Sequence, residues 1–523
     1  MSGTAQHNEQ ADELAKIGSG LKKRTEIALG DEFLRKAVAF TTDKLKTGRL
    51  KAMDDFGDWE MWRERGRAIR EHVVSHLDYY LTQFSDNVVK TGGHVHFCRS
   101  GEDAVRTFLD IARKAEAKLV AKGKSMVSEE IHLNHRLEEI GIEAVETDLG
   151  EYILQLAKET PSHLIIPAIH KNKQQIADLF SDHSGEKFPA ETKPLADYAR
   201  HKLRNIFLEA DIGLTGCNFG IAESGTVTLV SNEGNARMVS TIPKIHVVVM
   251  GMERLVPTFA DVEVMLNLLA RSATGQKLTT YTSFVTGPRR EGDLDGPEEL
   301  HVLVLDNGRS SQLGDPQFQE VLHCIRCAAC LNVCPVYKHV GGHTYGSVYS
   351  GPIGAVLTPL LQQDYKEAGE LSYASSLCGA CYEACPVKIP LHDMLVQLRH
   401  RKVKLKMTPV AERIAFKTYA TTFGNITLYK MAGKAAYWMQ QPLLREGSIR
   451  RAPGPLAGWT QSRFLRMKSK QSFRDRWAQL QQEMSRTPNR PEASGGAGSN
   501  GQVPSNPSQS SQPGGTSKEE GRT

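Results

Sequence analysis

The chain carries CIRCAACLNVCP at residues 324–335 and CGACYEACP at residues 378–386. Three cysteines at three-residue intervals, followed by a fourth and a proline, are the ligand pattern of a bacterial-type ferredoxin with two iron–sulfur clusters. The proline fixes φ and lacks an N–H, so the chain turns away after the fourth thiolate. The two stretches hold seven of the nine cysteines: Cys324, Cys327, Cys330, Cys334, Cys378, Cys381 and Cys385.

In ferredoxins with this pattern, the fourth cysteine of each run binds the neighbouring cluster. A structural zinc site also uses CxxC pairs, but zinc does not require a further cysteine and a proline in both runs. We therefore expect two iron–sulfur clusters of the [4Fe–4S] type. The first takes Cys324, Cys327, Cys330 and Cys385, and the second takes Cys334, Cys378 and Cys381.

The second run lacks its first cysteine, because Ser375 stands three residues before Cys378. The fourth corner of the second cluster is therefore unassigned. A Ser375 oxygen, another side chain, water and a three-iron [3Fe–4S] cluster are all compatible with the sequence. Ser375 is a candidate ligand of the second cluster on this basis.

The composition is that of a globular protein with two to four domains: 523 residues, 40% hydrophobic and 24% charged. No apolar run reaches the 18 or so residues of a membrane span. The N-terminus, MSGTAQHNEQADELAKIGSG, has no apolar segment typical of a secretory signal. Cysteines that bind iron as thiolates also indicate a reducing compartment, because an oxidising one would favour disulfides. We therefore expect a cytoplasmic protein.

Positive charge is concentrated near the C-terminus, although the net charge of the chain is only +5. Residues 388–480 hold nineteen Lys and Arg against four Asp and Glu. Such a block favours docking onto an acidic protein, with peripheral association to an anionic membrane surface as an alternative. No nucleic-acid-binding motif accompanies the charge, so nucleic acid is not expected. The alternative without a partner is that these charges form a solvated face.

Helical and β-rich segments alternate over residues 58–306, for example EDAVRTFLDIARKAEA followed by KLVAKGKS. This alternation predicts an α/β domain with a largely parallel sheet. The tail after Arg486 is rich in Gly, Ser and Pro and is predicted to be disordered. The predicted parts are an N-terminal polar segment and helix at 1–57, the α/β domain at 58–306, the ferredoxin-type domain at 307–392, a basic helical region at 393–484 and the tail at 485–523.

The segment of the α/β domain with the most candidate site residues is GLTGCNFGIAESGTVTLVSNEGN, which begins at Gly213. Gly213, Gly216 and Gly220 permit tight turns or a close approach of the backbone to a ligand. Glu223 is a candidate catalytic carboxylate, but a loop residue that hydrogen-bonds the backbone is the favoured interpretation. No GxGxxG or phosphate-binding loop is present, so a nucleotide is not indicated.

Two further candidates lie nearer the N-terminus. His94, His96 and Cys98 alternate on one face of a predicted strand and resemble metal ligands, although we favour a half-buried strand with Val95 and Phe97 in the core. The segment Lys122-Gly123-Lys124-Ser125 can hold a carboxylate at a helix N-terminus, or be a plain surface turn.

Several of these segments resemble the lactate-utilisation (LUD) domain family: KGKSMVSEEI, ETDLGEYILQL, PSHLIIPAIH, the segment from Gly213 and DNGRS. With the two cysteine runs added, residues 25–480 resemble the lactate-utilisation protein B family of iron–sulfur proteins. The resemblance implies an α/β domain similar to the NagB/RpiA/CoA-transferase fold, a two-cluster ferredoxin-like α-helical module and a helical C-terminal region. It identifies no substrate-binding residue.

The resemblance also implies a role in oxidising L-lactate to pyruvate. The expected partners are a CCG-type cysteine-rich protein and a second LUD-domain protein. Two alternatives are an iron–sulfur subunit of another 2-hydroxy-acid dehydrogenase, as in glycolate oxidation, and an autonomous 2-hydroxy-acid oxidoreductase. Nothing in the sequence resembles a flavin or nicotinamide site. Because oxidation of an alcohol normally needs such a cofactor, the autonomous oxidoreductase is disfavoured. The expected role is that of an electron-transfer subunit.

Overall fold

The computed structural model describes residues 20–486. The predicted disordered tail after Arg486 and most of the predicted N-terminal polar segment lie outside the described residues. The chain divides into two compact units, Met1–Thr408 and Pro409–Thr523. No helix in the described part of the chain has both the length and the apolar character needed to cross a bilayer.

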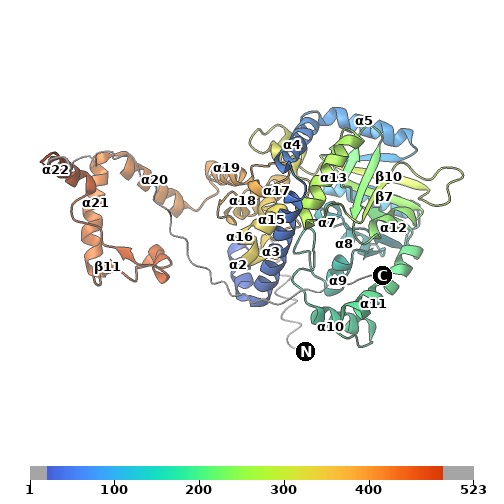
Figure 1. Ribbon diagram of the computed structural model, residues 1–523, viewed down its shortest axis with the longest axis horizontal. Helices are drawn as coiled ribbons and strands as arrows, with labels where there is room; N and C mark the ends of the chain where they lie inside the picture. Colours follow the sequence, from blue (N-terminus) through green and yellow to red (C-terminus); the bar gives the residue numbers. More distant parts are fainter. Residues whose placement is uncertain (1–19, 487–523) are drawn as a thin grey trace, which may run out of the picture. The chain divides into compact units, whose positions relative to one another are not determined.

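A six-stranded sheet forms the centre of the α/β part of the first unit (Figure 1). Its strands follow the order β1-β10-β7-β4-β2-β3, and every neighbouring pair is parallel. Parallel sheets are covered on both faces, and β7 alternates accordingly: Val247 and Val249 join the core on one face, and Val248 and Met250 the core on the other. The strands are β1 (His94–Cys98), β10 (Glu299–Leu305), β7 (Ile245–Gly251), β4 (Ile212–Thr215), β2 (Leu119–Lys122) and β3 (Glu143–Glu146).

Helices cover both faces of this sheet. Phe108 of α6 and Leu137 of α8 belong to the core on one face, and Phe84 of α5 belongs to the core on the other. Helices α9 to α11 form a further core near β2 and β3. The predicted α/β domain with a parallel sheet is therefore confirmed. The helices are α5 (Leu77–Lys90), α6 (Gly101–Lys114), α7 (Met126–Glu130), α8 (Leu133–Glu138), α9 (Leu149–Ala157), α10 (Lys173–Ser184), α11 (Thr192–Glu209), α12 (Asn235–Thr241) and α13 (Phe259–Thr274).

A second, four-stranded sheet connects the α/β core to the cysteine-rich segment. Its order is β8-β5-β6-β9. Val227 and Leu229 of β6 belong to a core of the main sheet, whereas Phe219 and Ile221 of β5 belong to the core that contains the cysteines. The strands are β5 (Phe219–Ile221), β6 (Thr226–Ser231), β8 (Leu255–Val256) and β9 (Tyr281–Val285).

The regular elements of the cysteine-rich segment are all helices, joined by loops. The insert between its two runs supplies α17 (Gly351–Gln362), whose Ile353, Val356, Leu357 and Leu360 are buried in the core that contains the cysteines. The other elements are α14 (Ser310–Leu313), η2 (Gln319–His323), α15 (Ala329–Val333), α16 (Pro335–Val340), η3 (His343–Tyr345), η4 (Ala368–Tyr373), α18 (Ala380–Ala384) and α19 (Leu391–Lys404).

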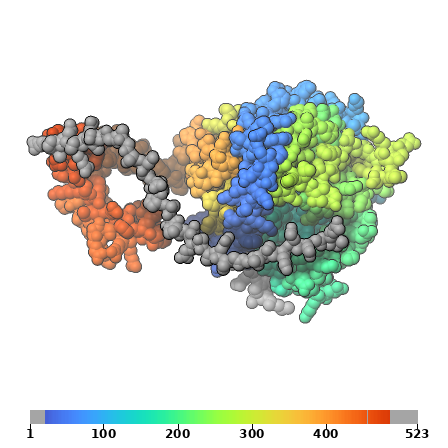
Figure 2. Space-filling model, viewed as in Figure 1, coloured from blue at the N-terminus to red at the C-terminus, as the bar shows by residue number. Residues whose placement is uncertain are grey.

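The N-terminal helices α2 (Leu21–Gly30), α3 (Glu32–Asp54) and α4 (Trp59–Ser75) pack against this segment despite the long separation in sequence. In Figure 2 the blue N-terminal helices lie between the yellow and orange cysteine-rich segment and the green α/β part. A side chain at Gly66 of α4 would collide with Leu268 of α13, since an added Cβ would lie 2.4 Å from its Cδ1. Helix α4 therefore fits closely against α13, and the N-terminal helices share a core with the cysteine-rich segment.

The second unit contains helices and two short strands. Its helices carry many exposed apolar side chains, including Phe416, Tyr419 and Trp438, and α20 has no buried residue. The elements are α20 (Val410–Gly424), α21 (Ile426–Gln440), η5 (Gln441–Leu443), β11 (Ser448–Ile449), η6 (Gly454–Leu456), η7 (Trp459–Gln461), β12 (Leu465–Arg466) and α22 (Phe473–Arg486). The described part of this region is thus mostly helical, as expected.

Candidate iron–sulfur centre

The two cysteine runs form loops with the same backbone. Arg326 and Leu377, each two residues after the first position of its run, have φ of 60° and 55°. Ala328 and Gly379, one residue after the next cysteine, have φ of 60° and 80°. Left-handed φ is uncommon for residues other than glycine, and a strained backbone of this kind is typical of functional sites. Its occurrence at matching positions indicates that the two loops share one backbone conformation.

The structure brings the first predicted group of ligands around one cavity. Its wall contains Cys324, Cys327, Cys330 and Cys385, and most of the remaining lining is apolar, including Leu164, Ile325, Ile353, Val387, Ile389 and Leu391. Burial raises the pKa of Cys330, and the charges of the other three thiols of the group, together with Cys381, raise it further. Four thiols facing one dry cavity fit a metal cluster, because bound cations compensate the charge of the thiolates.

Cys334, Cys378 and Cys381 form the second group. Burial and then the neighbouring Cys334 raise the pKa of Cys381 to about 12, with a smaller effect from Cys378. Burial is also the main cause that raises the pKa of Cys334. Cys378 is the exposed member of the group. The three residues that the crossed pattern assigns to one cluster therefore lie near one another.

Among the described residues, His94, Glu299 and His301 form a group of three possible metal-ligand atoms that lie within 4.8 Å of one another. For the cysteines, the preference for iron–sulfur clusters over a zinc ion rests on their pattern, because a structural zinc site does not require a further cysteine and a proline in both runs.

Backbone N–H groups point at the cysteine sulfur atoms. Arg326 N donates to Cys324 Sγ at 3.4 Å, Tyr337 N to Cys334 Sγ at 3.5 Å and Ile389 N to Cys385 Sγ at 3.4 Å. N–H···S bonds stabilise negative charge on thiolates and tune the potential of a bound cluster.

Ser375 occupies the first position of the second loop and is half-buried. Its Oγ accepts a hydrogen bond from Leu377 N at 3.1 Å. Arg399 of α19 supports the same loop, since its Nε and Nη2 donate to the Ser372 carbonyl at 3.0 and 2.8 Å. The guanidinium also lies over the ring of Tyr373, 4.9 Å from its centroid.

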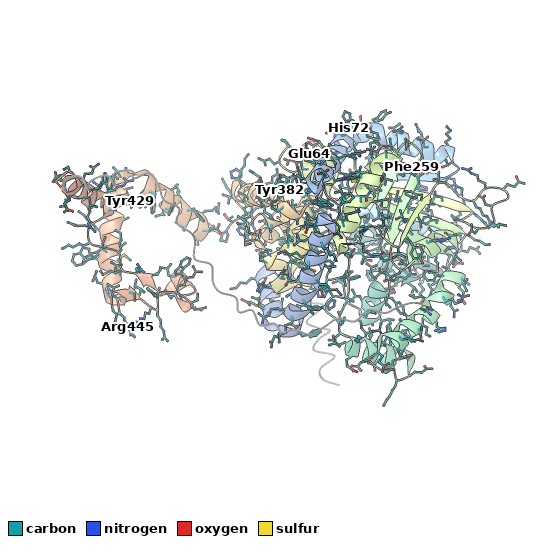
Figure 3. The ribbon with its side chains drawn as sticks, viewed as in Figure 1. Glu64, His72, Phe259, Tyr382, Tyr429 and Arg445 are labelled. Carbon is teal, nitrogen blue, oxygen red and sulfur yellow. The ribbon has the colours of Figure 1, made fainter. Side chains whose placement is uncertain are left out.

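Buried arginines surround the first group, and sequence reasoning missed them. Arg63 of α4 donates to the carbonyls of Cys385 at 2.9 Å and Tyr382 at 3.0 Å, in the region marked by Tyr382 and Glu64 in Figure 3. For the arginines on helices a signal was present in the sequence, because Arg49, Arg63 and Arg70 fall on the buried faces of α3 and α4. The further contacts are Arg49 to Ala384 O at 3.1 Å, Arg70 to Leu322 O at 3.0 Å and Arg254 to Cys324 O at 2.7 Å.

The other sequence candidates have mixed outcomes. Glu223 Oε1 accepts from Phe259 N at 2.7 Å at the start of α13, which is the backbone-bonding role we favoured. An added Cβ would lie 1.9 Å from Val239 O at Gly213 and 2.9 Å from Leu255 Cδ2 at Gly220. These two glycines therefore serve packing, whereas Gly216 lines a second cavity.

The strand β1 differs from expectation. Phe97 is 62% exposed, so its predicted place in the core is wrong, whereas Val95 is half-buried. The reason is that β1 is the edge strand of the sheet. His96 Nε2 lies 3.1 Å from His301 Nδ1 on β10, and Cys98 is buried. The potential ligand group joins His94 to Glu299 and His301 of β10, and it excludes both His96 and Cys98.

The segment Lys122–Ser125 is divided between two roles. Lys122 is fully buried and forms ion pairs with Glu129 and, at 2.5 Å, with Glu146. Lys124 and Ser125 line the second cavity, which also contains Gly216. The segment is therefore neither a simple surface turn nor a uniform anion site.

The basic residues after the second run are largely engaged within the fold. Arg401 forms an ion pair with Asp315 at 2.5 Å, and Lys402 is buried and donates to the Lys366 carbonyl at 3.1 Å. Arg399 supports the second cysteine loop. Lys404 and Lys406 are exposed. Among the basic residues from Arg399 to Lys406, Lys404 and Lys406 are therefore the ones available to a docking partner.

This fold and site define an iron–sulfur protein with an N-terminal LUD-type α/β domain. The family model for the LUD domain matches residues 81–305, and that for the 4Fe-4S dicluster domain matches residues 320–389. The chain is 53% identical over 451 residues to "Lactate utilization protein B" of Lysinibacillus sphaericus, covering 86% of this chain and 94% of that protein. It is 51% identical over 468 residues to the protein of that name from Bacillus subtilis, covering 88% and 97%.

The chain therefore belongs to the lactate utilization protein B family, as the sequence resemblance implied. It is a lactate-utilisation iron–sulfur protein. A crystal structure of a duf162 family protein from Deinococcus radiodurans matches 44% of this chain and 98% of its own, with 17% identity and a TM-score of 0.26.

Proposed function

We propose that this protein is the electron-transfer subunit of a cytoplasmic complex that oxidises L-lactate to pyruvate. The observation that carries the proposal is the pair of cysteine groups in one compact unit, one around a dry cavity and one with an exposed member, Cys378. Two [4Fe–4S] clusters bound there, or a [3Fe–4S] cluster at the second site, would supply one-electron transfer. The assigned ligands are Cys324, Cys327, Cys330 and Cys385 for the first, and Cys334, Cys378 and Cys381, with Ser375 as a candidate, for the second.

The residues around the two groups suit this role. Apolar walls exclude water from the first site, and Arg49, Arg63, Arg70 and Arg254 place positive charge around it. The second group reaches the surface through Cys378. An external electron carrier would therefore approach the second site, while the first remains inside the protein.

The proposed partners are a CCG-type cysteine-rich protein and a second LUD-domain protein of the same pathway. The names of the relatives support a lactate-utilisation system. Exposed Lys404 and Lys406 are available for an acidic partner surface. Peripheral contact with an anionic membrane is the alternative use of the basic block.

Purified protein, alone and with the two partners, tests the proposal directly. L-Lactate should reduce the iron–sulfur absorbance only when the partners are present. Reduction by lactate without partners would instead support the autonomous oxidoreductase. Growth of a deletion strain decides the substrate: loss of growth on glycolate but not on lactate would favour a glycolate-type dehydrogenase.

A further inference from the structure

A second cavity, of about 280 Å³, lies in the α/β part of the protein. We propose that it binds a small carboxylate, a 2-hydroxy or 2-keto acid, through Arg326 and next to the first iron–sulfur site. The carboxylate class follows from the residues of the cavity, whereas the choice of a 2-hydroxy or 2-keto acid rests on the proposed function.

The position of the cavity is that of a ligand site in an α/β sheet. Its wall includes residues 123–127, directly after β2, and residues 215–218, at and after the end of β4. Strands β2 and β4 are neighbours in the main sheet. The strand that follows β2 in the chain, β3, lies beyond β2, whereas the next main-sheet strand after β4, β7, lies on the other side of β4. The chain thus changes direction between these neighbouring strands. Ligands of open α/β sheets bind outside the carboxyl ends of the strands at such a switch point.

Arg326 supplies the group that recognises an anion. Its Nη1 is buried and has no hydrogen-bond partner among the described residues. Its Nη2 lies 3.6 Å from Glu253 Oε1, and Glu253 is bonded more closely by Arg309 Nε at 2.8 Å. The guanidinium lies over Tyr349, 4.6 Å from the ring centroid. A buried guanidinium N–H without an acceptor is costly, and a carboxylate oxygen in the cavity would satisfy it.

Two further cations line the same cavity. Arg254 is buried and makes no ion pair in the described part of the chain, although its Nη1 donates to the Cys324 carbonyl. Lys124 Nζ donates to the Ile165 carbonyl at 3.1 Å and lies 4.0 Å from Glu151. The acidic residues Asp148, Glu233 and Glu253 also line the cavity. The oxygens of Asp148 and Glu233 accept from the N–H groups of Glu151 and Leu149 at the start of α9, and Glu253 accepts from Arg309 Nε. The basic groups are therefore the ones that can receive a new charged ligand.

The cavity, at about 280 Å³, lies near the lower end of pockets for drug-sized ligands, which occupy about 300–1,000 Å³. It therefore has room for a metabolite of a few heavy atoms, and its polar groups, not its size, select the ligand. Its polar lining also includes Ser125, Asn218 and Asn235, which can contact a second oxygen such as a 2-hydroxyl or 2-keto group.

The cavity and the first cysteine site share part of their walls. Leu164 and Arg326 line both. The Arg326 side chain reaches the proposed carboxylate site, and its backbone N–H donates to Cys324 Sγ at 3.4 Å. An anion bound to Arg326 should therefore perturb a cluster held by Cys324 and leave the second cluster unaffected.

Calorimetric titration of the iron-loaded protein with sodium L-lactate, pyruvate, propionate and uncharged lactamide tests the proposal. We expect lactate or pyruvate to bind, lactamide to fail, and Arg326→Gln to weaken binding about tenfold or more, since a charge-assisted hydrogen bond is lost. Lys124→Gln, which contacts no cysteine, should also weaken binding. Lys118→Gln, at the exposed opposite end of β2, is the matched control and should have no effect. Bound ligand should change the EPR spectrum of the first cluster alone.

Each other outcome has a defined meaning. If no carboxylate binds, or if binding is the same in Arg326→Gln and Lys124→Gln as in the parent, the site is wrong. If propionate binds as tightly as lactate and both variants weaken it, the carboxylate site stands and the 2-hydroxy-acid assignment falls. If lactate binds as expected but the assembled complex does not oxidise it, the proposed function fails and the binding site remains.

Discussion

Ser375 stands in the second cysteine loop where Cys324 stands in the first. Cys324 Sγ accepts from the N–H of Arg326 at 3.4 Å, and Ser375 Oγ accepts from the N–H of Leu377 at 3.1 Å. The two donors have φ of 60° and 55°. The side chain of Ser375 therefore starts from the position of the missing thiolate, which keeps it a candidate for the fourth corner of the second cluster.

Ser375→Cys should convert the second site to four thiolate ligands. Because the backbone already matches the first loop, we expect the change without loss of stability, and a larger fraction of four-iron EPR signal after exposure to air. Ser375→Ala should increase the three-iron signal if the serine oxygen is a ligand. Two indistinguishable, air-stable four-iron clusters in the parent protein would contradict this account.

Arg399→Gln should weaken the second site selectively. The substitution removes donors from the Ser372 carbonyl and the contact with Tyr373, so the loop that begins at Ser375 loses its support. We expect faster loss of iron from the second cluster during incubation with a chelator, followed by EPR. His400→Gln, at the next position on α19 and exposed, is the control. Equal loss from both clusters would show that Arg399 has no particular role at this loop.

Arg63→Met should destabilise the region of the first site. It removes this donor from the carbonyls of Cys385 and Tyr382, which keep the backbone N–H groups of Lys388 and Cys385, and each lost hydrogen bond to a charged group costs about 1.5–3 kcal/mol. A lower midpoint of thermal unfolding and a lower yield of the first cluster should follow. Arg67→Met, one turn further along α4 and half-buried, breaks ion pairs only with Glu64 and Glu71 and should have a much smaller effect.

His246 should contribute to acid sensitivity. Burial lowers its pKa to about 3, against about 6.5 in the unfolded chain. The unfolded state therefore binds the extra proton between these pH values, so the free energy of unfolding falls as pH falls below about 6.5, by at most about 1.4 kcal/mol per pH unit. His246→Gln should flatten the dependence of the urea midpoint on pH between 6.5 and 4.5. The same substitution at exposed His183 of α10 is the control, and an equal slope in parent and variant would refute the assignment.

The features that depend on neighbouring residues in the chain could be predicted from the sequence. The cysteine spacing indicated both ligand groups, since each run fixes its own loop, and the alternation of helices and strands predicted the parallel sheet. Phe97 was wrongly predicted to lie in the core, because the alternation of residues along a strand does not reveal that β1 is an edge strand. The sequence did not reveal that Arg401 and Lys402, within the basic block, bond groups of the fold, since their partners Asp315 and the Lys366 carbonyl are distant in sequence.

Long-range packing could not be predicted from local pattern. Arg63 and Arg49 reach carbonyls more than 300 residues away, and nothing in α3 or α4 indicates which segment they cover. The second cavity likewise combines residues from Gly123 to Tyr349. Such sites arise from the order of strands in the sheet, which the chain sequence alone does not specify.

The crossed assignment of the cysteines is the central claim, and two single substitutions test it most directly. Two further variants serve as references: under either arrangement, Cys327→Ala should remove the first cluster and Cys378→Ala the second. Cys385→Ala lies in the second run but should also remove the first cluster, and Cys334→Ala lies in the first run but should remove the second. Iron and sulfide content with EPR of each reduced variant identifies the cluster that is lost. The account predicts that Cys385→Ala matches Cys327→Ala and that Cys334→Ala matches Cys378→Ala; the opposite pairing, or full iron content in all four variants, would contradict it.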